Sequence, residues 1–253
     1  MEEILLQDDG KLHLLTGRAG NVLPFLLREI GRRHDRGLPC VLLVPQQYTL
    51  EAERTLVREL QLPGLIDITV LSPQRLLYRI REAVGTGGLQ PLDERGRCMA
   101  IGCALHDERE QLEYYRTAVN QPGLTDKVSA LLGDLQHTEL PPAALLQASG
   151  EKNGAMAKKG RDIARVWAAY EAILGDRFAD TNRQMEDAAR QLARSGILTG
   201  VSLFVYGFDL LQPELCGLLA ESLRSARFVG IGLTMDSQAA DARIFEGQLQ
   251  SKA

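Results

Sequence analysis

The chain has 253 residues, of which 45% are hydrophobic and 25% charged, and its formal net charge is -4 at pH 7. This composition excludes collagen-like, mucin-like and intrinsically disordered proteins. A slightly acidic chain does not coat nucleic acid with its whole surface, so any DNA-binding groove must be local.

The sequence predicts a cytoplasmic protein without membrane or metal sites. Its start lacks the basic flank and apolar run of a signal peptide, and no run approaches the roughly 20 apolar residues that span a bilayer. The histidines show no ligand spacing. The cysteines lack CxxC spacing, and we expect buried, reduced thiols. They are Cys40, Cys98, Cys103 and Cys216.

Five short apolar runs predict the strands of an α/β protein. Because they are continuously apolar, they are typical of strands buried on both faces of a parallel sheet. Helix-period stretches separate them, which predicts helices on both faces of the sheet. The runs are Leu12–Thr16, Val41–Pro45, Ile68–Ser72, Leu203–Tyr206 and Phe228–Leu233.

Cap residues mark the first helices of this pattern. Thr49 is a plausible N-cap of a helix that ends at Pro63. Ser72 followed by Pro73 predicts the start of a second helix, which ends at Gly85.

The strand signal vanishes from about Pro91 to Gly196 and is replaced by pieces of helix. In the clearest piece, from Ile163 to Leu174, Trp167 falls on the apolar face and is predicted to be core. The pair Lys158 and Lys159 is placed in a polar loop before it.

These patterns predict one α/β domain with an inserted all-helical subdomain. We expect residues 1–90 and 197–253 to form the sheet domain and residues 91–196 the insert. A last helix is predicted from Ala242 to Leu249, where the chain resembles a fragment of something longer.

A glycine-containing turn after the first strand stands where a phosphate-binding loop would lie. The candidate loop residues are Gly17, Arg18, Ala19, Gly20 and Asn21. Val22 stands at the position of the second glycine. Leu23 replaces the phosphate-binding lysine, and Pro24 replaces the magnesium-binding hydroxyl. The sequence therefore predicts a degenerate nucleotide loop.

The fourth strand also lacks the acids of a nucleotide hydrolase. Tyr206 and Gly207 stand at the positions of the metal-binding aspartate and the catalytic glutamate. Phosphoryl transfer depends on positioned charges, so we expect no catalytic residue in this chain.

Polar and aromatic residues follow the strands at the end where open α/β sheets bind ligands. Arg75, Tyr78 and Arg79 are spaced i, i+3 and i+4, on the side of their helix away from Leu76 and Ile80. A cation beside an aromatic ring suits single-stranded DNA, through phosphate contact and base stacking. The alternative for each residue is a surface charge or a half-buried core aromatic.

Several stretches together resemble the N-terminal region of AddB, from the AddAB (RexAB-type) helicase-nucleases that process broken DNA ends in bacteria. They are LHLLTGRAG at Leu12–Gly20, LVPQQYTLEAER at Leu43–Arg54, VLSPQRLLYR at Val70–Arg79, VYGFDLLQPE at Val205–Glu214 and GLTMD at Gly232–Asp236. The match covers the sheet half more strongly than the insert.

The resemblance implies a RecA-like (P-loop NTPase-type) domain of a superfamily 1 helicase, of domain 1A/1B type, with degenerate motifs. It implies an AddA-like motor subunit as heterodimer partner and a place at the nucleoid during repair. Many relatives keep an intact phosphate loop, but this chain has lost it, which puts even structural ATP binding in doubt. The family's nuclease domain, with its iron-sulfur cluster and metal site, has no counterpart in this chain.

The resemblance also places candidate DNA-binding residues. Thr49, Arg75, Tyr78 and Phe208 match positions where the inactive helicase channel meets the 3′ strand that is scanned for the recombination hotspot Chi. Gln47 and Ser72, in the same turns, complete the candidate set.

Three hypotheses follow. The leading one is a non-catalytic domain that contacts single-stranded DNA. The second is a scaffold that binds only protein partners, and the third is a live NTPase that uses an unorthodox loop with Arg18. A run of arginines, Arg28, Arg32, Arg33 and Arg36, is interpreted as a solvated helix face.

Overall fold

The computed structural model describes residues 6, 8, 10, 12–18, 20–85, 88–138, 140–150 and 154–235. The chain divides into two compact units. We call Met1–Gly85 with Met185–Ala253 the sheet unit, and Thr86–Gln184 the helical unit. The helix expected at Ala242–Leu249 lies outside the described residues.

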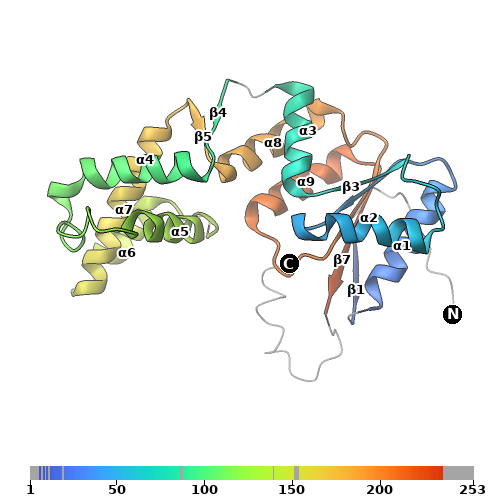
Figure 1. The fold of residues 1–253 in the computed structure, drawn as a ribbon, viewed down its shortest axis with the longest axis horizontal. Coiled ribbons are helices and arrows are strands. Elements are labelled where there is room, and N and C mark those ends of the chain that lie inside the picture. Colours follow the sequence, from blue (N-terminus) through green and yellow to red (C-terminus); the bar gives the residue numbers. More distant parts are fainter. Residues whose placement is uncertain are drawn as a thin grey trace. The chain divides into compact units, whose positions relative to one another are not determined.

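A five-stranded parallel sheet forms the centre of the sheet unit (Figure 1), which confirms the predicted α/β class. The strand order is β1-β7-β6-β2-β3. The strands are β1 (Leu12–Gly17), β2 (Cys40–Leu43), β3 (Ile68–Leu71), β6 (Ser202–Tyr206) and β7 (Phe228–Thr234). All five lie within a residue or two of the apolar runs that predicted them.

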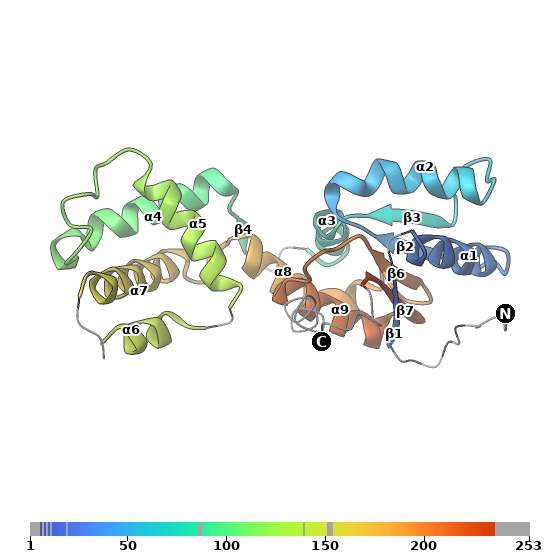
Figure 2. The same ribbon diagram turned by 90° about the horizontal axis from the view of Figure 1, so that it is seen from below.

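Helices cover both faces of this sheet (Figure 2). Side chains alternate along a strand, so Leu42 faces α1 (Val22–His34) and α2 (Thr49–Glu59) while Leu43 faces the opposite layer. That opposite layer consists of α3 (Pro73–Val84), α8 (Thr181–Ser195) and α9 (Pro213–Ser225). Two apolar cores, one on each face, therefore hold the sheet.

The prediction that every strand is buried on both faces is wrong for β1. Leu12 and Leu14 are 40% and 51% exposed. Both side chains lie on the same face of β1, an edge strand of the sheet, and the described residues leave that face partly uncovered. An apolar run alone does not show whether both faces of a strand are covered.

The helical unit packs around its own core, in which Trp167 and Tyr170 are buried. The prediction that Trp167 is a core residue is confirmed. Its helices are α4 (Glu94–Asp107), η2 (Arg109–Gln111), α5 (Leu124–Gln136), α6 (Pro142–Gly150) and α7 (Ala155–Leu174). It also contains a short parallel strand pair, β4 (Gln90–Pro91) and β5 (Phe178–Ala179), so the expectation of an all-helical insert is wrong. Two-residue strands are too short to give a periodic sequence signal.

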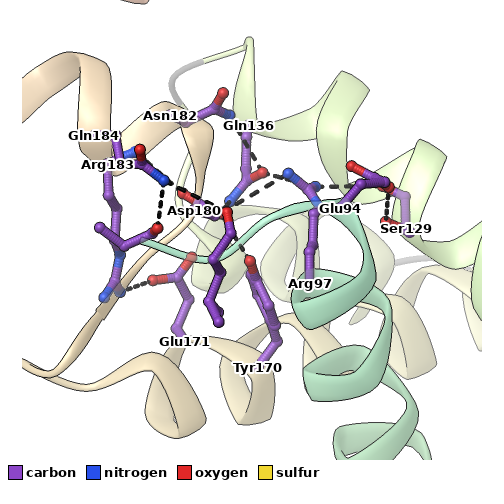
Figure 3. Close-up of polar contacts among 12 residues, drawn as sticks. Glu94, Arg97, Ser129, Gln136, Tyr170, Glu171, Asp180, Asn182, Arg183 and Gln184 are labelled. Carbon is purple, nitrogen blue, oxygen red and sulfur yellow. Dashed lines mark hydrogen bonds and ion pairs between the residues drawn. The ribbon is translucent and has the colours of Figure 1, made fainter. Parts of the chain in front are cut away.

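A buried carboxylate joins the elements of the helical unit (Figure 3). Asp180 is 1% exposed, and it accepts hydrogen bonds from the Tyr170 hydroxyl at 2.8 Å and the Gln136 amide at 3.2 Å. Arg97 lies 3.8 Å away and also donates to Gln136 at 2.9 Å. A buried carboxylate needs such partners, so this network has a structural role.

The observed unit boundaries differ from the expected insert of residues 91–196. The helical unit is Thr86–Gln184, and α8 continues across its second boundary into the sheet unit. Lys158 and Lys159 lie within α7 and not in a loop, because α7 begins at Ala155.

The cysteines are free, but only Cys40 is buried. Cys98 is half-buried, and Cys103 and Cys216 are exposed, so the expectation of four buried thiols is wrong. Within the described ranges, we find no helix with the length and apolar character needed to cross a membrane.

Candidate nucleic-acid interface

The candidate site residues gather at one edge of the sheet. All five strands are parallel, so the loops that follow them emerge at the same carboxyl edge. The loops after β6 and β2 lie close together, since a Cβ added to Gly207 would lie 3.4 Å from Cδ of Pro45. We call this edge, with its loops, the carboxyl edge.

The candidate nucleotide loop is a short turn between β1 and α1. Gly17 ends the strand, the Asn21 amide donates to the Arg18 carbonyl at 3.1 Å, and Gly20 has φ +87°. The helix begins at Val22, immediately after Asn21. Ala19 lies outside the described residues.

Apolar side chains stand where this turn would contact phosphates. Val22 is 5% exposed, and its Cγ2 would lie 3.2 Å from a Cβ added to Gly17. Leu23 is half-buried against the core, and Pro24 has no backbone N–H to donate. The turn therefore offers neither a lysine nor a hydroxyl to a triphosphate.

The end of β6 carries no carboxylate at the two positions where a nucleotide hydrolase would need one. Tyr206 packs half-buried against the core beneath α1, and Gly207 has φ +83°. Asp209 is exposed two residues farther on. Glycine tolerates this left-handed conformation, whereas a glutamate there would be strained.

Of the two candidate residues in the turn after β2, Gln47 is exposed and Thr49 is buried. Thr49 is 8% exposed, and its hydroxyl donates to the Gln46 carbonyl at 3.0 Å. The prediction that Thr49 is an N-cap is wrong, because a 3-10 helix, η1 (Gln46–Tyr48), precedes it and Tyr48 takes the cap position. Tyr48 is 51% exposed, and Gln47 is also exposed. The accessible groups of this turn are therefore Gln46, Gln47 and Tyr48.

The cap after β3 is confirmed. Ser72 accepts a hydrogen bond from the Arg75 amide at 3.2 Å, and Pro73 occupies the first helical position. Ser72 is 0% exposed, so its side chain is used to start α3. This start directs Arg75 and Tyr78 outward, and Tyr78 is 63% exposed.

A groove of about 620 Å³ runs along the free edge of β3 beside α3. Its polar lining includes Arg75, Arg79, Glu53 and Glu82. Arg75 Nη1 lies 4.0 Å from Glu53 Oε1. A hydrogen bond to the Glu82 carboxylate raises the pKa of Tyr78. The two arginines and two glutamates balance formally, so these four side chains give the groove no net charge.

The structure brings only part of the candidate set together. Arg75 and Tyr78 share the groove. Phe208 is half-buried and packs against the core on the α9 face. Glu53 and Glu82 were missed. Glu82 lies four residues after Tyr78 on α3, a spacing that could have indicated it, whereas Glu53 comes from α2.

Among the residues that the structure describes, no group of three or more His, Cys, Asp or Glu side chains is placed to hold a metal ion.

The fold and this edge define an α/β protein with an inserted helical unit and a strand-to-helix turn that lacks phosphate-loop side chains. The family model described as "ADDB, N-terminal" matches residues 14–251, and the chain belongs to this family.

Bacterial proteins that are named as one subunit of an ATP-dependent helicase/deoxyribonuclease are similar to this chain. The protein of Symbiobacterium thermophilum is 30% identical over 213 residues, which cover 82% of this chain and 18% of the relative. The protein of Pelotomaculum thermopropionicum is 32% identical over 248 residues, which cover 94% of this chain and 21% of the relative. The chain thus spans about a fifth of the length of these curated relatives.

Proposed function

We propose that this chain is a RecA-like, non-catalytic domain of an AddB-type subunit that contacts single-stranded DNA at its carboxyl edge during the processing of broken ends. An AddA-like subunit would supply the motor. Membership of the AddB N-terminal family and the parallel sheet with its helical insert support this proposal.

The proposed domain does not use ATP. A nucleoside triphosphate needs backbone donors, a lysine and a magnesium ligand. Here Val22 packs over Gly17, and Leu23 and Pro24 stand at the lysine and hydroxyl positions. The residues present do not fit the nucleotide. The carboxyl edge is therefore proposed to bind DNA without a nucleotide beside it.

One observation carries the DNA-binding proposal: Arg75 and Tyr78 are exposed together, one turn apart, in an open groove at the carboxyl edge. A phosphate would replace Glu53 as the partner of Arg75. A base would stack on the Tyr78 ring, and such stacking contributes about 1–3 kcal/mol per base. Tyr48 offers a second exposed ring in the neighbouring loop.

The test is fluorescence anisotropy with a labelled single-stranded oligonucleotide. Tyr78→Ala should weaken binding about tenfold or more, whereas Tyr78→Phe, which keeps the ring, should bind like the parent. Arg75→Ala should also weaken binding, while Arg190→Ala, which removes an exposed arginine from α8, should not. Equal affinities for the parent, Tyr78→Ala and Arg75→Ala would overturn the proposal.

A second candidate function, docking of a protein partner, is favoured by the outer face of α2. Leu50 is 56% exposed, and with Val57 and Leu65 it lines a mostly apolar hollow of about 560 Å³. Ile66, beside Leu65 in the chain, is 86% exposed. Clustered exposed apolar side chains are typical of protein interfaces. Leu50→Asp should then release the motor subunit without changing the affinity for DNA.

A further inference from the structure

A second polar pocket lies at the amino edge of the sheet, opposite to the carboxyl edge. It has a volume of about 430 Å³ and borders the beginnings of β6 and β7. We call it the amino-edge pocket. Its charged lining consists of Asp8, Glu29, Arg32, Arg33, Arg36 and Arg227.

Arg33 forms the floor of this pocket and is held rigidly. It is 3% exposed, so the interpretation of the arginine run as a solvated helix face is wrong at this position. Its Nε donates to Glu29 at 3.1 Å and its Nη1 to the Ser202 hydroxyl at 3.2 Å. The guanidinium lies 3.8 Å from the ring centroid of Phe228. These contacts fix its position whether or not the pocket is occupied.

One carboxylate bridges two guanidinium groups inside the pocket. Asp8 Oδ1 accepts from Arg33 Nη1 at 2.5 Å, and Asp8 Oδ2 accepts from Arg227 Nε at 2.6 Å. Burial opposes ionisation of Asp8, but the hydrogen bonds from Arg227 and Arg33 outweigh it and lower its pKa. The two arginines are therefore already spaced to share a single oxyanion.

The pocket carries more positive charge than its carboxylates offset. Four arginines line it against two carboxylates, a formal charge of two positive units. Arg32 and Arg33 belong to the last turn of α1, where they also offset the negative end of the helix dipole. Arg36 and Arg227 lie outside that helix and also line the pocket.

We propose that the amino-edge pocket binds a phosphate-bearing anion, which displaces the carboxylate of Asp8 from Arg33 and Arg227. Guanidinium groups bind phosphate through paired, charge-assisted hydrogen bonds, as they bind carboxylate. A phosphate carries more charge than one carboxylate and can also reach the exposed Arg36. This site is separate from the groove of Arg75 and Tyr78, so either proposal can fail alone.

Isothermal titration of the 253-residue chain with inorganic pyrophosphate tests the proposal. Asp8→Ala removes the competing carboxylate and should bind pyrophosphate about tenfold more tightly than the parent. Asp176→Asn, which removes an exposed carboxylate from the helical unit, should match the parent. Unchanged affinity in Asp8→Ala would overturn the proposal.

A matched pair of arginine variants tests the site independently of Asp8. Arg227→Gln should weaken pyrophosphate binding about tenfold, whereas Arg224→Gln, three residues earlier on the exposed end of α9, should not. If both variants lose the same pyrophosphate affinity, the effect comes from net charge alone. That result would contradict a specific binding site at Arg227. This pair remains decisive if Asp8→Ala folds poorly.

Single-stranded DNA distinguishes the source of the phosphate. If Asp8→Ala tightens binding of both pyrophosphate and an oligonucleotide, the pocket holds a backbone phosphate. If it tightens only pyrophosphate, the ligand is a small phosphate compound. If neither ligand binds more tightly, the pocket is a purely structural ion-pair cluster and the proposal fails.

Discussion

Single residues decide the chemistry of the carboxyl edge. Val22 packs over Gly17 where a phosphate loop would be open, and Gly207 occupies a left-handed conformation against Pro45. Both positions are held by the packing of neighbouring residues. We therefore expect that restoring one lysine or one glutamate does not restore a nucleotide site.

Two glycine substitutions test this account at the residue level. Gly207→Ala should lower the free energy of unfolding by about 1–2 kcal/mol, because φ is +83° and the new Cβ meets Pro45 at 3.4 Å. Gly217→Ala, in the exposed middle of α9 with nothing within 4 Å, should instead raise it by about 0.5–1 kcal/mol. Urea unfolding measures both changes, and a neutral Gly207→Ala would contradict the strain argument.

At the scale of elements, one buried carboxylate anchors the segment after η2 to α7. Asp162 is 1% exposed, and it accepts hydrogen bonds from three consecutive backbone amides. They belong to Glu113 at 2.9 Å, Tyr114 at 2.8 Å and Tyr115 at 2.9 Å. The Lys159 ammonium nitrogen lies 4.6 Å from the centroid of the exposed Tyr114 ring.

Asp162→Asn should destabilise the helical unit by about 2–3 kcal/mol, because the new NH₂ group would face backbone donors. The amides of residues 113–115 should then exchange hydrogen faster than in the parent. Asp134→Asn, at an exposed position of α5 in the same unit, serves as control and should leave this exchange unchanged. Unchanged protection in Asp162→Asn would show that the segment is held by other contacts.

Elements with strong local signals were predictable. Ser72 and Pro73 define the start of α3 through a cap that needs no distant partner. The exposure of β1, the strand pair β4 and β5, and the burial of Arg33 depend on residues far away in the chain. At the candidate site, the shared exposed face of Arg75 and Tyr78 on α3 could be predicted from their helical spacing. Glu53, which pairs with Arg75 across the groove, comes from α2 and was not visible in that pattern.

At the scale of the whole molecule, the sheet unit and the helical unit have separate apolar cores. The proposed DNA contacts belong to the sheet unit alone. The network around Asp180 belongs to the helical unit alone (Figure 3). A change in that network should therefore leave the carboxyl edge intact.

Tyr170→Phe tests this independence. It removes the hydroxyl that donates to Asp180, and it should lower the stability of the helical unit by about 1–3 kcal/mol. Hydrogen exchange should quicken in that unit, while affinity for single-stranded DNA should equal that of the parent. A parallel loss of DNA affinity would place part of the binding surface in the helical unit.

The central claim is that the carboxyl edge holds single-stranded DNA without using ATP. The most direct test is fluorescence anisotropy of a labelled single-stranded oligonucleotide with this chain, at low and moderate salt, with and without ATP. We predict binding that weakens as salt rises, because phosphate contacts release counterions, and that ATP leaves unchanged. Affinity that changes with ATP, or no binding at either salt, would contradict the account.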